Sequence, residues 1–139
     1  MMIFPQLDQY LKEEFSADYW SDYAVLYAIE LVQKMTPTDW NQLKSCWRDR
    51  APLWQYRSAE IIADGDSRQA IPLLLEMLET ADDELTLTAV DSLRSMGIAD
   101  KNLELSQDIF TRLHKIAPNN PIAQIVVNEL LKALPIMTF

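Results

Sequence analysis

Few side chains in this sequence could take part in catalysis. It has one cysteine, Cys46, and one histidine, His114. Lys44 and Arg48 lie within a helical turn of Cys46, and nearby cations lower the pKa of a thiol. No serine, cysteine or second histidine is placed by the sequence beside His114, so a nucleophile with its base cannot be assembled. We interpret Cys46 as a small buried side chain and His114 as a core-edge or surface residue, and we predict no catalytic residues and no enzyme.

Consecutive carboxylates are the nearest approach to a metal site. Asp82, Asp83 and Glu84 follow one another, and oxygen ligands of this kind bind divalent cations. They lack the alternating spacing and central glycine of a calcium loop, and one of them is needed to cap the next helix. Asp64 and Asp66, on either side of a glycine, are interpreted in the same way as turn and capping residues. With one cysteine and one histidine no zinc cluster can form, and we expect no metal and no cofactor.

The charge of the chain favours binding to a basic protein. Twelve basic and 21 acidic residues give a net charge of −9, which argues against nucleic acid as a partner because phosphates would be repelled. Residues 51–100 alone carry ten acidic and three basic side chains. Such a concentration favours a basic partner, although an acidic surface also keeps a protein soluble. The candidate contacts in this region are Asp64, Asp66, Asp82, Asp83 and Glu84.

A second candidate surface lies in the aromatic segment 18–27. Its acidic and aromatic residues are Asp18, Tyr19, Trp20, Asp22, Tyr23 and Tyr27. Helical spacing favours Trp20, Tyr23 and Tyr27 as core residues. The alternative is an exposed aromatic side chain beside acids, which is typical of an interface hot spot, and Asp18, Tyr19 and Asp22 are its candidate contacts.

Helices must position all of these residues, because no sustained alternation of polar and apolar residues predicts a strand. We predict an all-α chain of seven or eight helices. Their expected ranges are 5–15, 18–35, 37–48, 52–65, a helix capped by Asp66, a helix closed by Gly97, 103–116 and a last helix from Pro121. Thr36 and Asp39 provide a reciprocal cap for the third of these.

Apolar residues at helical spacing predict the core. The clearest positions are Trp54, Ile61 and Ile62; then Ala70, Ile71, Leu74, Leu75 and Leu78; then Leu85, Ala89, Val90, Leu93 and Met96; and finally Ile109, Leu113 and Ile116. The run Ala24–Ile29 is apolar on all sides, as in a helix covered on two faces. Short loops between the helices imply antiparallel neighbours.

Internal repetition favours an open stack of hairpins over a closed bundle. Residues 54–59 are echoed at 84–89, one helical hairpin later. The stretch 54–97 resembles the HEAT-like repeat of the phycobilisome-lyase type. The resemblance rests on Arg57, Ala59, Gly65-Asp66, the run Ala70-Ile71-Pro72-Leu73-Leu74, the acidic turn, Ala89 and Leu93; Leu85-Thr86 departs from the usual Val-Arg pair. It implies a short α-solenoid of antiparallel helical hairpins.

The overall plan is also similar to small HEAT-like immunity proteins of bacterial polymorphic toxin systems, which are compact, acidic, cytoplasmic and all-helical. This resemblance implies a protein that binds and neutralises a cognate, basic, nuclease-like toxin domain, as a monomer or weak dimer. The alternatives are a general HEAT-like adaptor or assembly scaffold and, third, a chromophore-lyase-like accessory protein.

Length and composition fit one domain over residues 1–139. The chain is 49% hydrophobic, which excludes a disordered polypeptide. Its longest apolar run, Ala24–Ile29, is too short to span a membrane, and the N-terminus lacks the pattern of a secretion signal. We therefore expect a soluble cytoplasmic protein without a membrane partner.

Overall fold

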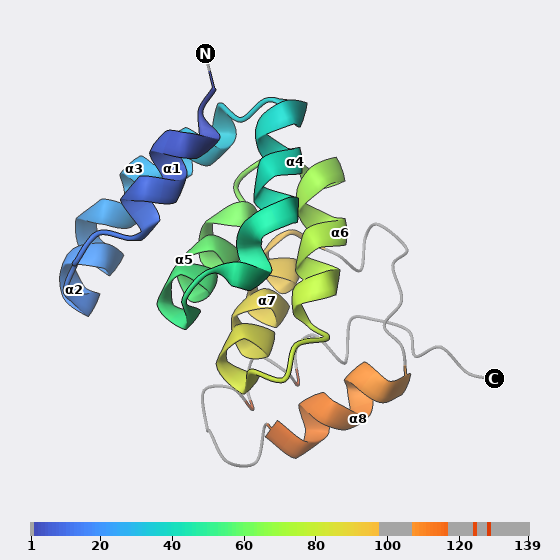
Figure 1. Cartoon of the computed structure of the whole chain (residues 1–139). Helices are drawn as coiled ribbons and strands as arrows, with labels where there is room; N and C mark the ends of the chain where they lie inside the picture. Colours follow the sequence, from blue (N-terminus) through green and yellow to red (C-terminus); the bar gives the residue numbers. More distant parts are fainter. Residues whose placement is uncertain (1, 98–106, 117–123, 125–127, 129–139) are drawn as a thin grey trace. The chain divides into compact units, whose positions relative to one another are not determined.

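The computed structural model describes residues 2–97, 107–116, 124 and 128. Every regular element in these residues is helical (Figure 1), which confirms the all-α prediction. The chain divides into two compact units, Met1–Leu73 and Leu74–Phe139. The solenoid arrangement and the single domain stay predictions, and the helix expected from Pro121 lies almost wholly outside the described residues.

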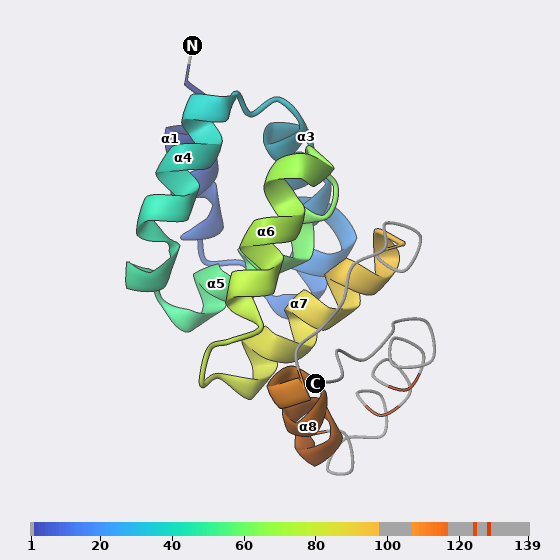
Figure 2. The same ribbon diagram turned by 90° about the vertical axis from the view of Figure 1, so that its right-hand side faces the viewer.

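The first unit is built on four main helices, α1 (Phe4–Leu11), α3 (Val25–Gln33), α4 (Pro37–Cys46) and α5 (Pro52–Ile62). Helix α1 contacts α3, α4 and α5, and α3 contacts α5 (Figures 1 and 2). Helix α1 is shorter than predicted, and α4 continues into the 3-10 turn η2 (Trp47–Asp49). The largest fully buried side chains of this unit are Leu7, Leu11, Trp40, Leu43, Trp47, Ile61 and Ile62.

The helix predicted over 18–35 contains a π-helical turn. It consists of α2 (Ala17–Tyr19), the π turn η1 (Trp20–Ala24) and α3, joined through residues that keep helical backbone angles. Its buried positions Trp20, Ala24 and Ala28 recur at every fourth residue. An α-helix has about 3.6 residues per turn and a π turn is wider. A helix that contains both kinds of turn therefore has close to four residues per turn on average, so side chains four positions apart stay on the same side.

Asp39 caps two helices at once. The predicted reciprocal cap of α4 is confirmed, since Thr36 Oγ1 accepts from the Asp39 amide at 3.3 Å and Asp39 Oδ2 accepts from the Thr36 amide at 2.9 Å. Asp39 Oδ1 also accepts from the amides of Ile3 and Phe4, both at 2.9 Å, at the start of α1. Burial acts to raise the pKa of Asp39, but the hydrogen bonds from Phe4, Thr36 and Ile3 outweigh it and hold the pKa below its usual value.

Gly65 connects α5 with α6 (Ser67–Met77) where the backbone passes close to a buried indole. A Cβ atom at this position would lie 2.7 Å from Cζ2 of Trp40, which is 1% exposed. Real Cβ atoms do not come so close, so a side chain here requires the Trp40 ring to shift.

We expect Gly65→Ala to lower the free energy of unfolding by about 1–3 kcal/mol, because it overpacks the Trp40 site. Urea unfolding of the single variant measures this cost. The same substitution in a Trp40→Phe background should cost less, since the smaller ring leaves room. An equal cost in both backgrounds would show that contact with Trp40 is not the cause.

The second unit contains the C-terminal part of α6, then α7 (Asp83–Ser95) and α8 (Gln107–Ile116). Gly97 has a φ of 65°, which confirms the predicted left-handed stop after α7. Arg112 of α8 donates to the carbonyl oxygen of Leu78 at 3.0 Å and to Asp83 Oδ1 at 3.2 Å. Helix α8 is thus tied to the α6–α7 connection.

The apolar pattern of α6 and α7 was predicted in large part. Ala70, Leu74 and Leu78 are buried, whereas Ile71 and Leu75 are only half-buried. Leu73 and Met77, which the predicted stripe omits, are buried instead, because the covered face of α6 is rotated toward these positions. In α7, Leu85, Ala89, Val90 and Leu93 are buried and Met96 is half-buried; Trp54, Ile61 and Ile62 of α5 are buried as predicted. Leu113 of α8 is buried, Ile116 is half-buried, and the side chain of Ile109 lies outside the described part.

Leu74→Ala should lower the free energy of unfolding by about 2–4 kcal/mol. The side chain is fully buried, and its truncation removes apolar contacts and leaves a cavity. Thermal or urea unfolding provides the measurement, with Leu75→Ala on the half-buried side of the same helix as the matched control. The control should cost clearly less; the reverse order would place the covered face of α6 elsewhere.

Candidate protein-binding surface

The acidic turn at residues 64–66 serves mainly to start a helix. Asp66 Oδ1 accepts from the amide of Arg68 at 3.0 Å and lies 3.5 Å from its Nε atom, so Asp66 is the predicted cap of α6. Gln69 lies three residues after Asp66, the position that could complete a reciprocal cap, but its Oε1 atom instead accepts from Nζ of Lys44 at 2.6 Å. Asp64 is exposed and available to a partner.

The acidic turn at residues 82–84 is also occupied by contacts within its own unit. Asp82 Oδ1 accepts from the amides of Glu84 at 3.0 Å and Leu85 at 3.3 Å, so Asp82 caps α7 as predicted. Asp83 pairs with Arg112 at 3.2 Å. Asp83 and Glu84 are both exposed, and the carboxylate of Glu84 takes no part in the cap or in the pair with Arg112.

The aromatic segment differs from the favoured interpretation. Trp20 is buried, as predicted, but Tyr23 and Tyr27 are 65% and 45% exposed, so their prediction as core residues was wrong. Tyr19 and Leu26 are likewise 50% and 60% exposed. Helix α3 is therefore covered on one side only, not on two. We call Tyr19, Tyr23, Leu26 and Tyr27 the tyrosine row.

Contacts between aromatic rings hold the tyrosine row in place. Tyr27 packs edge-on against Tyr10 of α1 with ring centroids 4.8 Å apart. Tyr19 stacks on Phe15 at 5.5 Å and lies 5.5 Å from Tyr23. Phe15 in turn lies 5.2 Å from Tyr10. These rings form one connected group, so the row loses little side-chain entropy when a partner binds.

Arg57 supports this group from the protein interior. Its side chain, 4% exposed, lies over the rings of Phe15 and Trp20 at 5.3 Å and 5.0 Å. It also donates to the carbonyl oxygens of Leu11 at 3.1 Å, Glu13 at 2.8 Å and Phe15 at 3.4 Å. The connection between α1 and α2 is thus anchored to α5, and Phe15 is fixed beneath Tyr19.

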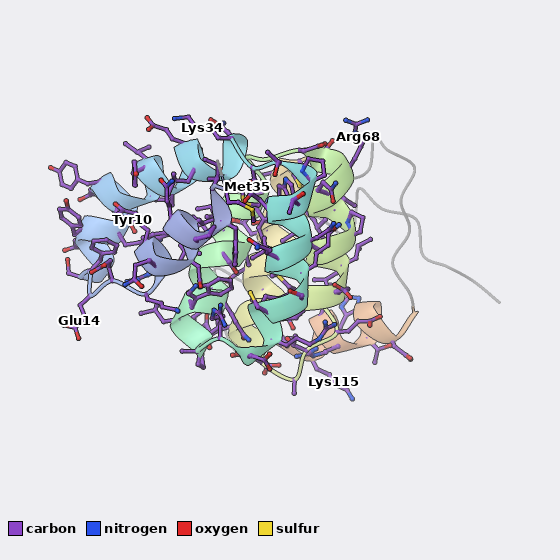
Figure 3. The ribbon with its side chains drawn as sticks, turned by 45° about the horizontal axis from the view of Figure 1, so that its top comes forward. Tyr10, Glu14, Lys34, Met35, Arg68 and Lys115 are labelled. Carbon is purple, nitrogen blue, oxygen red and sulfur yellow. The ribbon has the colours of Figure 1, made fainter. Side chains whose placement is uncertain are left out.

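The segment that carries the tyrosine row has acidic charges only. Residues 13–30 contain no lysine or arginine. Their carboxylates are all exposed, namely Glu13, Glu14, Asp18, Asp22 and Glu30. In Figure 3 Glu14 and Lys34 lie at opposite ends of the helices of the first unit, and Tyr10 lies between them. The row is an apolar strip within a negative surface.

Cys46 and His114 have ordinary environments. The half-buried Cys46 thiol lies 3.8 Å from the carbonyl oxygen of Leu43, and burial raises its pKa, with the charge of Arg50 acting in the opposite direction. The raised pKa agrees with the interpretation of Cys46 as a buried side chain rather than an activated thiol. His114 is exposed. Among the described residues, no three histidine, cysteine or acidic side chains gather in a way that could hold a metal ion.

The fold and this surface define an all-α protein with an exposed acidic, aromatic face. No family model, curated protein or solved structure matches the chain. Within the described residues no helix has the length and apolar character needed to cross a membrane.

Sequence reasoning named Asp18, Tyr19 and Asp22 as one alternative, and the structure places all three at the exposed surface. It missed Leu26 and the supporting roles of Tyr10, Phe15 and Arg57. The four-residue spacing of Tyr19, Tyr23 and Tyr27 was the signal that could have identified the row.

Proposed function

We propose that this chain is a protein-binding module that captures a basic partner through the tyrosine row and its carboxylates. The observation that carries the proposal is an exposed strip of three tyrosines and one leucine within a segment that lacks basic residues. Exposed aromatic rings are common centres of interface affinity. Their faces attract lysine and arginine cations, while the surrounding carboxylates speed association with a positive surface.

The same charges argue for a partner of a different kind from the chain itself. Two copies meeting through this surface would bring like carboxylates together, which is unfavourable. Nucleic acid would be repelled for the same reason. A basic protein can cover the apolar strip with its own side chains and pair its cations with the carboxylates around the strip.

We further propose that the partner is a toxin domain, which this chain neutralises in the manner of an immunity protein. The support is the acidic surface together with the resemblance of residues 54–97 to HEAT-like repeats. An adaptor or scaffold would use the same surface but would not inhibit its partner.

The experiment is co-expression with the product of the adjacent gene, followed by size-exclusion chromatography and a growth assay. A stable complex and restored growth are expected. A complex without protection would support the adaptor instead. A neighbouring product that is toxic yet neither binds nor is neutralised would contradict the immunity proposal.

A further inference from the structure

A cleft of about 450 Å³ opens between the end of α1 and the beginning of α5, within the first unit. This volume falls in the range of small-molecule sites, about 300–1,000 Å³. Its lining includes the apolar side chains of Leu11, Leu53 and Trp54 and three cationic side chains, Lys12, Arg50 and Arg57. No residue of the tyrosine row lines this cleft.

Positive charge gathers in this cleft although the chain carries a net charge of −9. Arg57 is 4% exposed, and its hydrogen bonds go to neutral carbonyl oxygens. Burial lowers the pKa of Arg57 and the charge of Glu60 acts in the opposite direction, but in the described part of the chain no carboxylate lies within salt-bridge distance of Arg57. Burying a charge without a counter-charge in direct contact is costly. An anion that entered the cleft would supply that counter-charge.

Donors remain for such an anion on the other two cations. Arg50 uses Nε and Nη2 to hold Asp8, each at 2.9 Å, and a guanidinium has five N–H donors. Lys12 lies 3.6 Å from the same carboxylate and its side chain is 47% exposed. Both can therefore turn a donor toward the cleft while Asp8 stays paired.

The rest of the lining selects against small inorganic ions. Leu53 is 55% exposed and adds an accessible apolar side chain to the lining. The Trp54 indole is held by a hydrogen bond from Nε1 to Asp8 at 3.1 Å and offers a fixed apolar wall. Asp49 also lines the cleft, and its carboxylate disfavours a doubly charged anion.

We propose that this cleft binds a small organic monoanion, a carboxylate carried on an aromatic or aliphatic body. The carboxylate lies toward Arg57 and Lys12, and the apolar body packs against Leu53 and Trp54. This site shares Arg57 with the support beneath the tyrosine row but contains none of the row's own residues, and it does not depend on the proposed function.

The test is titration of the full chain with phenylacetate, followed by amide and indole chemical shifts in two-dimensional NMR. Phenylacetamide and inorganic phosphate serve as comparison probes. We expect saturable shifts at the Trp54 indole and the Leu53 amide with phenylacetate, and at least tenfold weaker binding of the other two probes. Equal binding of phenylacetamide would remove the role of the cations. Equal binding of phosphate would remove the role of the apolar lining, and either result overturns the proposal.

Two variants place the site without disturbing Arg57, whose loss would destabilise the fold. Lys12→Gln and Leu53→Asp should each weaken phenylacetate binding at least fivefold at unchanged melting temperature. Lys34→Gln, a change of an exposed lysine outside the cleft, is the matched control and should change nothing. Absence of saturation at about 10 mM phenylacetate, or equal affinity in all variants, would show that the cleft is not a binding site.

Discussion

Asp39→Ala is expected to lower the free energy of unfolding by about 3–6 kcal/mol, because it leaves the buried Phe4 amide without an acceptor, at about 1–3 kcal/mol, and removes the bonds to the partly exposed Ile3 and Thr36 amides with the α4 cap. The Asp39 carboxylate is fully buried and accepts from the amides of Ile3, Phe4 and Thr36. Its removal takes away the cap of α4 and the support of the first turn of α1 together. Urea unfolding followed by circular dichroism measures the loss.

Glu14→Ala is the matched control for this prediction, since Glu14 is an exposed carboxylate of the same unit. Its effect should stay within about 0.5 kcal/mol. A similarly small effect of Asp39→Ala would show that the two helix starts do not depend on the shared carboxylate.

The contribution of Asp39 should also depend on pH. Its pKa is lower in the folded chain than the usual value of an aspartate, about 3.9 in unfolded peptides. The stabilisation is therefore fully present above that value and is lost as the pH falls through the folded-state pKa. The difference in unfolding free energy between the wild-type chain and Asp39→Asn should be constant from pH 5 to 7 and shrink below about pH 4. A difference that does not change with pH would mean that the ionised form has no special role.

Arg57→Met should lower the free energy of unfolding by about 3–5 kcal/mol. The variant keeps an apolar stem of similar length but loses the hydrogen bonds to the carbonyl oxygens of Leu11, Glu13 and Phe15. It also loses the stacking of the guanidinium on Phe15 and Trp20. Chemical unfolding measures the cost, and Arg57→Lys should restore only part of it, because an ammonium cannot reproduce the planar fork of donors.

Arg68→Met is the corresponding control. The Arg68 side chain is 90% exposed and lies 3.5 Å from Asp66 in a surface pair, which is worth little. Its effect should remain within about 0.5–1 kcal/mol. If both arginine variants cost the same small amount, Arg57 does not anchor the α1–α2 connection.

The parts of the fold set by local chemistry could be predicted from the sequence. Helix ends are marked by contacts between near neighbours in the chain. The hydrogen bonds of Thr36 with Asp39 begin α4, those of Asp82 begin α7, and the backbone angle of Gly97 ends α7. Buried positions in α5, α6 and α7 follow from apolar spacing, which reports which residues share a side of a helix.

The remainder depends on contacts between distant residues. Asp39 also accepts hydrogen bonds from the amides of Phe4 and Ile3, which lie 35 and 36 positions earlier in the chain. Arg57 reaches carbonyl groups 42 to 46 residues earlier. Nothing in the periodicity of Tyr23 and Tyr27 states whether a neighbouring helix covers them, so their shared side could be identified but their exposure could not.

The most direct test of the account is the affinity of the adjacent gene's product, the proposed partner, for four forms of this chain: wild type, Tyr23→Ala, Asp22→Lys and Glu84→Lys. Isothermal titration calorimetry at fixed salt gives each dissociation constant, and melting temperatures confirm that each variant is folded. Because Tyr23 is the most exposed of the tyrosine row, its removal should weaken binding about 30-fold, equivalent to about 2 kcal/mol. Asp22→Lys should weaken binding and slow association, whereas Glu84→Lys, an equal charge reversal on the other unit, should change affinity less than about twofold. Unchanged affinity for Tyr23→Ala and Asp22→Lys, together with a large loss for Glu84→Lys, would contradict the account and place the interface at the acidic turn of residues 82–84.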